Sequence, residues 1–174
     1  FSSISRPSPP STRPRAYVTV VVMIQLSQTA IEEFKADFSG SVILPEDMQY
    51  EETRQIWNAM IDRRPSMIAR CTSPDDVVQC LNFVRRHDLP FSVRGGGHNI
   101  AGNSVCDDGV MIDLALMKDV SIDQKLHRGY VEPGCTLADF DAAAQTYGLA
   151  TPLGINSTTG VAGLTLGGGF GWLS

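Results

Sequence analysis

The most constraining feature of the sequence is a run of three glycines that follows an apolar stretch and ends in a histidine. "PFSVRGGGHNIAG" spans residues 90–102, and "LPFSVRG" has the length and apolar content of a β-strand. Glycine loses more conformational freedom on folding than any other residue, so three in succession need a reason. Gly95, Gly96 and Gly97 would let backbone amides approach an anion closely. Alone, the run is equally consistent with a tight turn or a bulge.

The segment before the glycine run has the pattern of a strand–helix–strand unit. "SMIARC" (66–71) is short and apolar, which predicts a buried strand. Residues 72–89 predict a helix, since Thr72 or Ser73 can cap it and Pro74 suits its first turn. The predicted apolar stripe of this helix consists of Val77, Leu81 and Val84. A strand, a helix and a second strand over about 30 residues predict a βαβ unit with parallel strands.

Apolar spacing also predicts elements on both sides of this unit. Helices are expected at 29–38, with Ile31, Phe34 and Phe38 on one face, and at 50–61, with Ile56, Trp57, Met60 and Ile61 on one face. Short strands are expected at 109–116, 119–123 and 128–134. A helix at 136–148 would carry Leu137, Phe140, Ala144 and Tyr147 and stop at Gly148. Together these elements predict an α+β fold with mixed sheets.

The two ends of the chain differ in composition from its middle. Residues 1–22 are rich in Ser, Pro and Arg, so we expect a disordered or spurious extension ahead of Met23. We expect a helical lead-in at 23–62 and the main domain at 63–174. The sequence stops inside a glycine-rich segment, "GLTLGGGFGWLS", so we expect a piece of a longer protein, with Trp172 and Leu173 exposed and little activity by itself.

Composition excludes several functional classes. A net charge of −5 argues against a nucleic-acid partner, which needs a basic surface. The longest apolar run, "AYVTVVVMIQL" (16–26), is too short to span a membrane. The four cysteines and three histidines show no metal-binding spacing, so we expect no metal site. Buried free thiols are expected, and they favour a reducing, cytoplasmic compartment.

Two known phosphate-binding motifs nearly fit the first glycine loop, and both fail. "GHNIAGNS" (97–104) has the spacing of a P-loop, but Asn103 stands where the lysine is required. The dinucleotide fingerprint fails because Ile100 stands at its third glycine. Neither a nucleoside triphosphatase nor a Rossmann domain is therefore expected.

A second glycine-rich segment, "GINSTTGVAGLTLGGGFG" (154–171), changes the interpretation of the first. Two such loops on one domain favour a long, thin ligand that lies against backbone. Backbone amides and the hydroxyls of Ser157, Thr158 and Thr159 would then hydrogen-bond that ligand.

Four motifs, "RGGGHNIAG", "VEPGCTLADFD", "GLATPLG" and "STTGVAGLTLGGGFGWL", together resemble the FAD-linked oxidase family. The resemblance is to the vanillyl-alcohol-oxidase-like fold and its berberine-bridge-enzyme branch, and it covers about residues 40–174. It implies the N-terminal part of a PCMH-type FAD-binding domain, built of two α+β subdomains with mixed sheets. The substrate domain of the family would be absent from this chain.

The resemblance also implies how a cofactor would be held. The first loop would wrap the FAD pyrophosphate, and His98 would be joined to the 8α-methyl group of the isoalloxazine ring. Some members have a second tether through a cysteine, but Asn156 occupies the matching position here, so we expect a single tether. The implied cofactor-binding residues are Arg94, Gly95, Gly96, Gly97, His98, Asn99, Gly102, Gly134, Gly154, Ser157, Thr158, Thr159, Gly160 and Gly163.

The activity that the resemblance implies is hydride transfer from an alcohol, amine or sugar to flavin N5, with molecular oxygen as acceptor. The substrate stays open among sugars, alkaloids and phenols, and no catalytic base is assigned. Asp113 is the most interesting acid, and we expect it to cap or bridge locally. One alternative is an inactive flavin-binding module or gene fragment. Another is a noncovalent, NADPH-dependent reductase, against which a histidine directly after three glycines argues.

Overall fold

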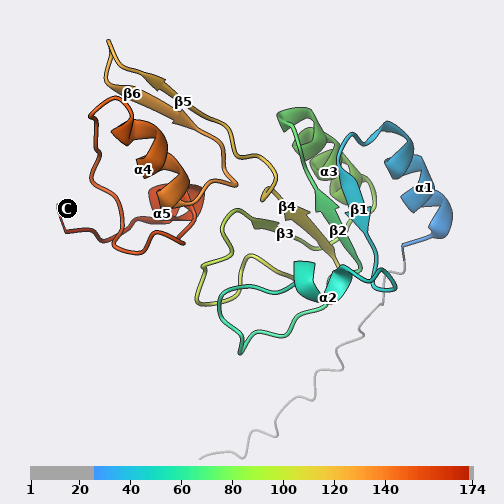
Figure 1. The fold of residues 1–174 in the computed structure, drawn as a ribbon. Coiled ribbons are helices and arrows are strands. Elements are labelled where there is room, and N and C mark those ends of the chain that lie inside the picture. The colour runs from blue at the N-terminus through green and yellow to red at the C-terminus, as the bar shows by residue number, and fades with distance from the viewer. Residues whose placement is uncertain (1–25, 173–174) are drawn as a thin grey trace, which may run out of the picture.

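A four-stranded sheet forms the centre of the first half of the protein (Figure 1). The structure is a computed structural model that describes residues 26–172. The strands are β1 (Ser41–Ile43), β2 (Met67–Arg70), β3 (Phe91–Arg94) and β4 (Val110–Asp113), in the order β1-β2-β4-β3. The predicted strands β2 and β3 do run in the same direction, but β4 lies between them and pairs with both in parallel. Because β1 pairs with β2 antiparallel, the sheet is mixed.

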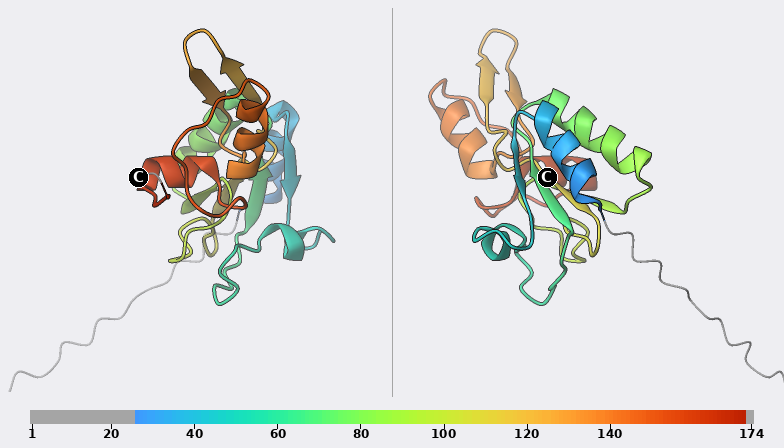
Figure 2. Two further views of the ribbon diagram at one scale, coloured as in Figure 1. Left: turned by 60° about the vertical axis from the view of Figure 1, so that its left-hand side comes forward. Right: turned by 90° about the vertical axis from the view of Figure 1, so that its right-hand side faces the viewer.

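Two helices, α1 (Gln28–Asp37) and α3 (Pro74–Arg86), lie side by side on one face of this sheet (Figures 1 and 2). Their contact includes Phe34 and Phe83, whose ring centroids are 4.8 Å apart. Ser73 caps α3 as predicted, in a capping box with Asp76. The predicted stripe of α3 is partly wrong, since Leu81 is exposed and Cys80 and Phe83 are buried instead. The predicted face of α1, with Ile31, Phe34 and Phe38, is buried.

The opposite face of the sheet is covered by loops and by the short helix α2 (Tyr50–Thr53). The helix predicted over 50–61 is therefore wrong beyond its first turn. Its continuation would need the amide of Trp57 to bond within the helix, whereas that amide donates to the carbonyl of Gly97. Trp57 and Met60 are exposed rather than packed on an apolar face. The predicted helical lead-in also contains strand β1, which pairs with β2.

The second subdomain has a two-stranded antiparallel ribbon and two helices (Figure 1). Its elements are β5 (Val120–Asp123), β6 (Arg128–Val131), α4 (Leu137–Gln145) and α5 (Val161–Gly167). A small core of Cys135, Leu137 and Val161 joins the start of α4 to the start of α5. Phe140 and Ala144 face inward as predicted, but Tyr147 is exposed. Helix α5 was not predicted, because its glycines favoured a loop.

Several sequence-based expectations concern features outside the sheets. The expected extension over residues 1–22 lies outside the described residues, as does Leu173, while Trp172 is 82% exposed. Between residues 26 and 172, no helix is both long and apolar enough to cross a membrane. Over the same range, no cluster of three or more potential ligands could hold a metal ion. All four cysteines are free thiols, and only Cys106 is partly accessible.

Candidate functional site

The site begins at the carboxyl edge of the main sheet, where three charged residues stand in register. Arg70, Asp113 and Arg94 are the last residues of β2, β4 and β3, and Asp113 pairs directly with both arginines. The carboxylate of Asp113 is fully buried and accepts hydrogen bonds from Arg70 Nε at 3.1 Å and from Arg94 Nη2 at 2.7 Å. In a parallel sheet this edge is where ligands usually bind. Asp113 therefore bridges two neighbouring arginines, in line with the expected local role. One of them, Arg94, directly precedes the glycine loop.

The second guanidinium nitrogen of Arg94 fixes a neighbouring segment. Its Nη1 donates to the backbone carbonyls of Thr53 and, at 3.0 Å, of Gln55. The chain after Gln55 also donates side-chain hydrogen bonds to the glycine loop. Asn58 Nδ2 donates to the carbonyl of Ile100 at 2.8 Å, and Arg63 Nη1 donates to the carbonyl of Gly102 at 3.0 Å. Hydrogen bonds from Asn58 and Arg63 therefore support the first glycine loop in addition to the loop's own turn.

Close backbone approach explains why glycine is needed in the first loop. A Cβ on Gly96 would lie 2.5 Å from the Cα of Gly160, so the two glycine-rich segments meet backbone to backbone at this point. A Cβ on Gly95 would lie 2.7 Å from the carbonyl oxygen of Pro133. Gly97 has φ +69°, a conformation that favours glycine. The first loop therefore needs glycine for packing and for conformation.

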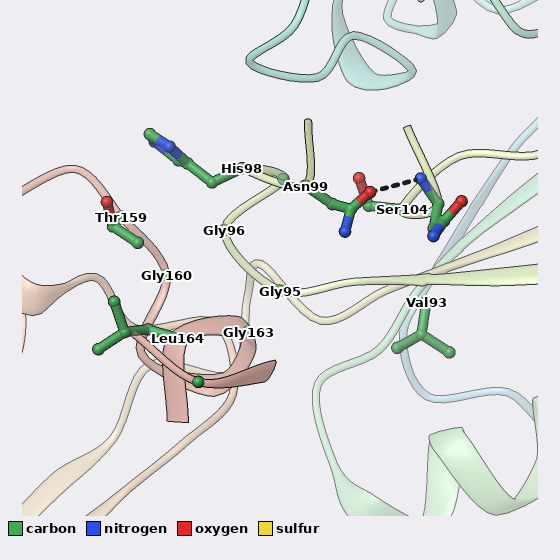
Figure 3. A pocket seen from close by; sticks show the side chains of 13 residues that line it. Val93, Gly95, Gly96, His98, Asn99, Ser104, Thr159, Gly160, Gly163 and Leu164 are labelled. Atoms are coloured by element: carbon green, nitrogen blue, oxygen red, sulfur yellow. Dashed lines mark hydrogen bonds between the residues drawn. The ribbon is translucent and has the colours of Figure 1, made fainter. Parts of the chain in front are cut away.

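A cavity of about 370 Å³, called here the larger hollow, lies where the two glycine-rich segments meet (Figure 3). Its polar lining comes from His98, Asn99, Asn103, Ser104 and Thr159. The hydroxyl of Ser104 is buried and has no hydrogen-bond partner among residues 26–172. A buried polar group without a partner costs free energy, so this hydroxyl is suited to a polar ligand in the hollow. The remaining lining residues are Val93, Gly95, Gly96, Gly97, Gly160, Gly163, Leu164 and Gly168.

A second cavity of about 310 Å³, the smaller hollow, borders the same three glycines. Trp57, Lys118 and Gly134 contribute to its wall, together with Gln55, Ile56, Arg94, Ala115 and Thr136. The half-exposed ammonium group of Lys118 lies 3.5 Å from the carboxylate of Asp139, so an ion pair stands at this wall. Because both hollows share Gly95, Gly96 and Gly97, a long ligand could contact the loop in both.

His98 lies between the two glycine-rich segments and is half buried. Figure 3 shows its side chain extending from the loop on the side where Thr159 and Gly160 lie. Its Nε2 is 3.4 Å from the hydroxyl of Thr158, and that hydroxyl donates to Asn156 Oδ1 at 3.0 Å. The Thr158 hydroxyl has one hydrogen, which is used on Asn156, so it faces His98 as an acceptor. This arrangement favours a hydrogen on Nε2 and a lone pair on Nδ1.

Most residues predicted to bind a cofactor are brought together here. Gly95, Gly96, Gly97, His98, Asn99, Thr159, Gly160 and Gly163 line the larger hollow, and Arg94 and Gly134 line the smaller one. Thr158 contacts His98 directly. Gly102, Gly154 and Ser157 line neither hollow. The carbonyl of Ser157 accepts from the amide of Ala138, and a Cβ on Gly154 would meet Leu164, so both have structural contacts.

Several lining residues were missed by the sequence analysis. Ser104 is the last position of the failed P-loop pattern, and its small hydroxyl in a glycine-rich loop was the available signal. Trp57 belongs to the predicted helix over 50–61, and nothing in its spacing indicated a contact with His98. Burial raises the pKa of the Cys106 and Cys135 thiols, which keeps them neutral and makes neither a suitable second attachment point.

Comparison with known proteins gives consistent results. The model of the FAD binding domain family matches residues 65–174. The chain is similar to the (R)-6-hydroxynicotine oxidase of Paenarthrobacter nicotinovorans, with 37% identity over 135 residues, which are 78% of this chain and 30% of that protein. It is also similar to the uncharacterised FAD-linked oxidoreductase YgaK of Bacillus subtilis, with 34% identity over 80% of this chain and 31% of that protein.

Solved structures show the same fold. A crystal structure of 6-hydroxy-D-nicotine oxidase from Arthrobacter nicotinovorans superposes with a TM-score of 0.77 and 36% identity, over 79% of this chain and 30% of that one. The BBE-like 1 protein of Physcomitrella patens superposes with a TM-score of 0.77 at 24% identity, over 82% and 31%. The chain therefore spans about 30% of the length of the proteins that it matches.

Proposed function

The chain belongs to the FAD binding domain family of FAD-linked oxidoreductases, and we propose that its two glycine-rich segments hold FAD between them. The observation that carries this proposal is the larger hollow, which is lined by glycines of both segments and by polar residues that include Ser104, whose buried hydroxyl has no hydrogen-bond partner among the described residues. A dinucleotide is long, thin and anionic, which matches two adjacent hollows that share one glycine loop.

The residues present fit this cofactor in shape and in polarity. Gly95 and Gly96 bring main chain to the wall of both hollows, and the space beside Gly163 is open, since a Cβ there would meet nothing within 4 Å. We assign Ser104, Asn99 and Thr159 as hydrogen-bonding residues for the cofactor. Arg94 would contribute through its backbone, because its guanidinium group is engaged with Asp113 and two carbonyls.

We further propose that His98 is the single point of covalent attachment. His98 would form a C–N bond to the 8α-methyl carbon of the isoalloxazine ring, with loss of one N–H and one C–H hydrogen. The two electrons released would reduce the flavin and pass to molecular oxygen, giving hydrogen peroxide. The position of His98, between the two segments and half buried, supports this assignment. Asn156, at the position of the second tether in some relatives, instead accepts hydrogen bonds from Thr158.

In the complete protein, bound FAD would accept hydride at N5 from an alcohol, amine or sugar and pass the electrons to oxygen. The chain's own residues would bind and orient the cofactor, as the protein's role is in flavoenzymes generally. The relatives that it matches are about two and a half times as long, so substrate contacts and the catalytic base are assigned to parts outside this chain. The substrate is a small molecule of one of these classes.

The test is to load the protein with FAD, denature it in acid, and measure flavin absorbance on the polypeptide and in the filtrate. We expect flavin to stay with the wild-type polypeptide and to be released by His98→Ala. The matched control is His87→Ala, which changes a histidine at the end of α3 that lines neither hollow. Flavin retained by His98→Ala would contradict the assignment. Complete release by the wild type, with oxidation of NADPH, would instead support the noncovalent reductase.

A further inference from the structure

We propose that Trp57 is a positioning residue that holds the imidazole ring of His98 in the orientation needed for flavin attachment. The flavin part of this inference rests on the proposed function, but the contact itself does not. The indole of Trp57 and the imidazole of His98 are stacked, with ring centroids 5.3 Å apart and an angle of 21° between the planes. The two residues come from different loops and lie 41 positions apart in the sequence.

Burial does not explain the place of Trp57. Its side chain is 61% exposed, which leaves a large apolar surface in water. An exposed tryptophan in a loop gains little from the hydrophobic effect, so its fixed position must come from specific contacts. Those contacts are the stack on His98 and a hydrogen bond of 3.1 Å from its backbone amide to the carbonyl of Gly97, the residue just before His98.

The segment that carries Trp57 is itself anchored on the sheet. Arg94 holds the carbonyls of Thr53 and Gln55, and the buried Asp113 holds Arg94. On the far side of Trp57, Asn58 donates to the carbonyl of Ile100 at 2.8 Å. The tryptophan is therefore tied on both sides in sequence, and its ring presents a fixed flat surface to the imidazole.

Thr158 restricts the same ring from a second direction. Stacking fixes the plane of the imidazole, but it leaves the ring free to rotate within that plane. The contact of 3.4 Å between His98 Nε2 and the Thr158 hydroxyl removes this freedom. Together, Trp57 and Thr158 define which nitrogen of His98 is directed away from the Thr158 segment. Attachment reactions depend steeply on geometry, and an error of about 1 Å can cost about a hundredfold in rate.

The first experiment uses the chain without cofactor and does not depend on flavin chemistry. NMR of the protein labelled at histidine should show the ring protons of His98 shifted upfield by the indole ring current. Trp57→Ala should abolish the shift and increase the mobility of the ring, whereas Trp57→Phe should keep a reduced shift. Trp172→Ala, which removes the exposed tryptophan near the end of the described chain, should change neither. An unchanged His98 signal in Trp57→Ala would overturn the proposal.

The second experiment measures the rate of covalent flavin incorporation. Trp57→Ala should incorporate FAD about tenfold to a hundredfold more slowly than wild type, and Trp57→Phe should recover most of the rate. Thr158→Ser should behave as wild type and Thr158→Val should be slowed. Equal rates in wild type and Trp57→Ala would contradict the positioning role. If wild type incorporates no covalent flavin, the tether itself is refuted, and the NMR measurement still decides whether Trp57 orders His98.

Discussion

The two glycine-rich segments that form the larger hollow are supported in different ways. The first, residues 95–103, starts at a buried ion-pair network and receives hydrogen bonds from Asn58 and Arg63. The second, residues 154–171, is held mainly by backbone hydrogen bonds at its middle, such as those from Leu137 to Thr159 and from Val161 to Cys135. Beyond Val161 much of it is exposed, including Leu166 and Phe170, which are 88% and 69% accessible, although Leu164 packs against the small core.

Because of this difference, the two segments contribute differently to the stability of the site. The first segment is anchored by charged side chains, which support the backbone that carries His98. The second is held by backbone hydrogen bonds to the chain around the start of α4, by the close approach of Gly160 to Gly96, and by the small core around Cys135. The first segment's anchor is the ion-pair network of Arg70, Asp113 and Arg94, and we expect substitutions in it to lower the free energy of unfolding. Substitutions at the contact between the segments should cost both stability and cofactor binding.

The largest expected loss of stability follows from removal of the Asp113 carboxylate, the centre of the anchor. Asp113→Ala would leave Arg70 and Arg94 without their shared carboxylate at the sheet edge. Removing one partner of a buried ion pair costs about 3–5 kcal/mol, and we expect a loss of that size in the free energy of unfolding measured with urea. Asp119→Ala, an exposed acid in the second subdomain, is the control. A loss below about 1 kcal/mol for Asp113→Ala would mean that the anchor is not needed.

The contact between the two segments is tested by Gly96→Ala. The new Cβ would lie 2.5 Å from the Cα of Gly160, so the backbones must separate. Overpacking of this kind costs about 1–3 kcal/mol, and FAD affinity, measured by quenching of flavin fluorescence, should fall with it. Gly163→Ala provides the contrast, because its Cβ meets no protein atom within 4 Å and lies inside α5. It should be as stable as wild type or more stable.

The helix caps of the two subdomains allow a comparison of pH dependence. Burial raises the pKa of Asp76, but hydrogen bonds from Thr72, Ser39 and Ser73 outweigh it and leave the pKa below its ordinary value of 3.8. Hydrogen bonds from Thr136 lower the pKa of Asp139 in the same way. Carboxyl groups with lowered pKa values stabilise the fold above the ordinary pKa. That contribution is lost as pH falls through the lowered value.

We expect Asp76→Asn to lose about 1–2 kcal/mol of unfolding free energy at neutral pH, as for a lost helix cap. Asp139→Asn should lose less, because its carboxylate is more than a third exposed and is screened by solvent. Urea unfolding at pH 7 and at about pH 3 measures both effects, and the difference between variant and wild type should shrink at the lower pH. Equal losses at both pH values would show that the ionised carboxylates do not stabilise the caps.

The smallest expected effect on the fold is that of Ser104→Ala. Its hydroxyl has no hydrogen-bond partner in the part of the chain that the structure describes, so the free energy of unfolding should stay within about 0.5 kcal/mol of wild type or rise. FAD affinity should fall about fivefold to tenfold, since a hydrogen bond contributes about 1 kcal/mol. Fluorescence titration measures it, with Ser121→Ala on β5 as the control. Unchanged affinity would place the cofactor away from Ser104.

Local patterns predicted much of this structure, and the failures lie where distant segments meet. The cap at Ser73 and the strands at Met67–Arg70 and Phe91–Arg94 depend on neighbouring residues, so they could be read from the sequence. The insertion of β4 between those two strands could not, because no local pattern specifies which strands pair. The helix expected over residues 50–61 does not continue beyond its first turn, because the backbone amide of Trp57 donates to the carbonyl of Gly97 in the glycine loop.

In the candidate site, too, local patterns were predicted and contacts between distant segments were not. Glycine spacing and the position of His98 indicated the two loops, and the resemblance to a known family supplied their assignment to FAD. Neither could indicate Trp57 as a contact of His98, because that role depends on where loops come together in space. For Ser104, the sequence offered only a small hydroxyl in a glycine-rich loop. The resemblance implied Arg94 as a cofactor-binding residue, but its side chain binds Asp113 and neighbouring carbonyls.

The strand order also constrains when the site can form during folding. Strand β4 follows β2 and β3 in the chain but lies between them, so β3 has no partner in this sheet until β4 docks. Asp113 is the last residue of β4, and Arg94 lacks its carboxylate until that moment. Closure over such sequence separations is slow relative to local helix formation. During synthesis from the N-terminus, the glycine loop is therefore made before its anchor, and a chain able to bind cofactor arises only when the central sheet is complete.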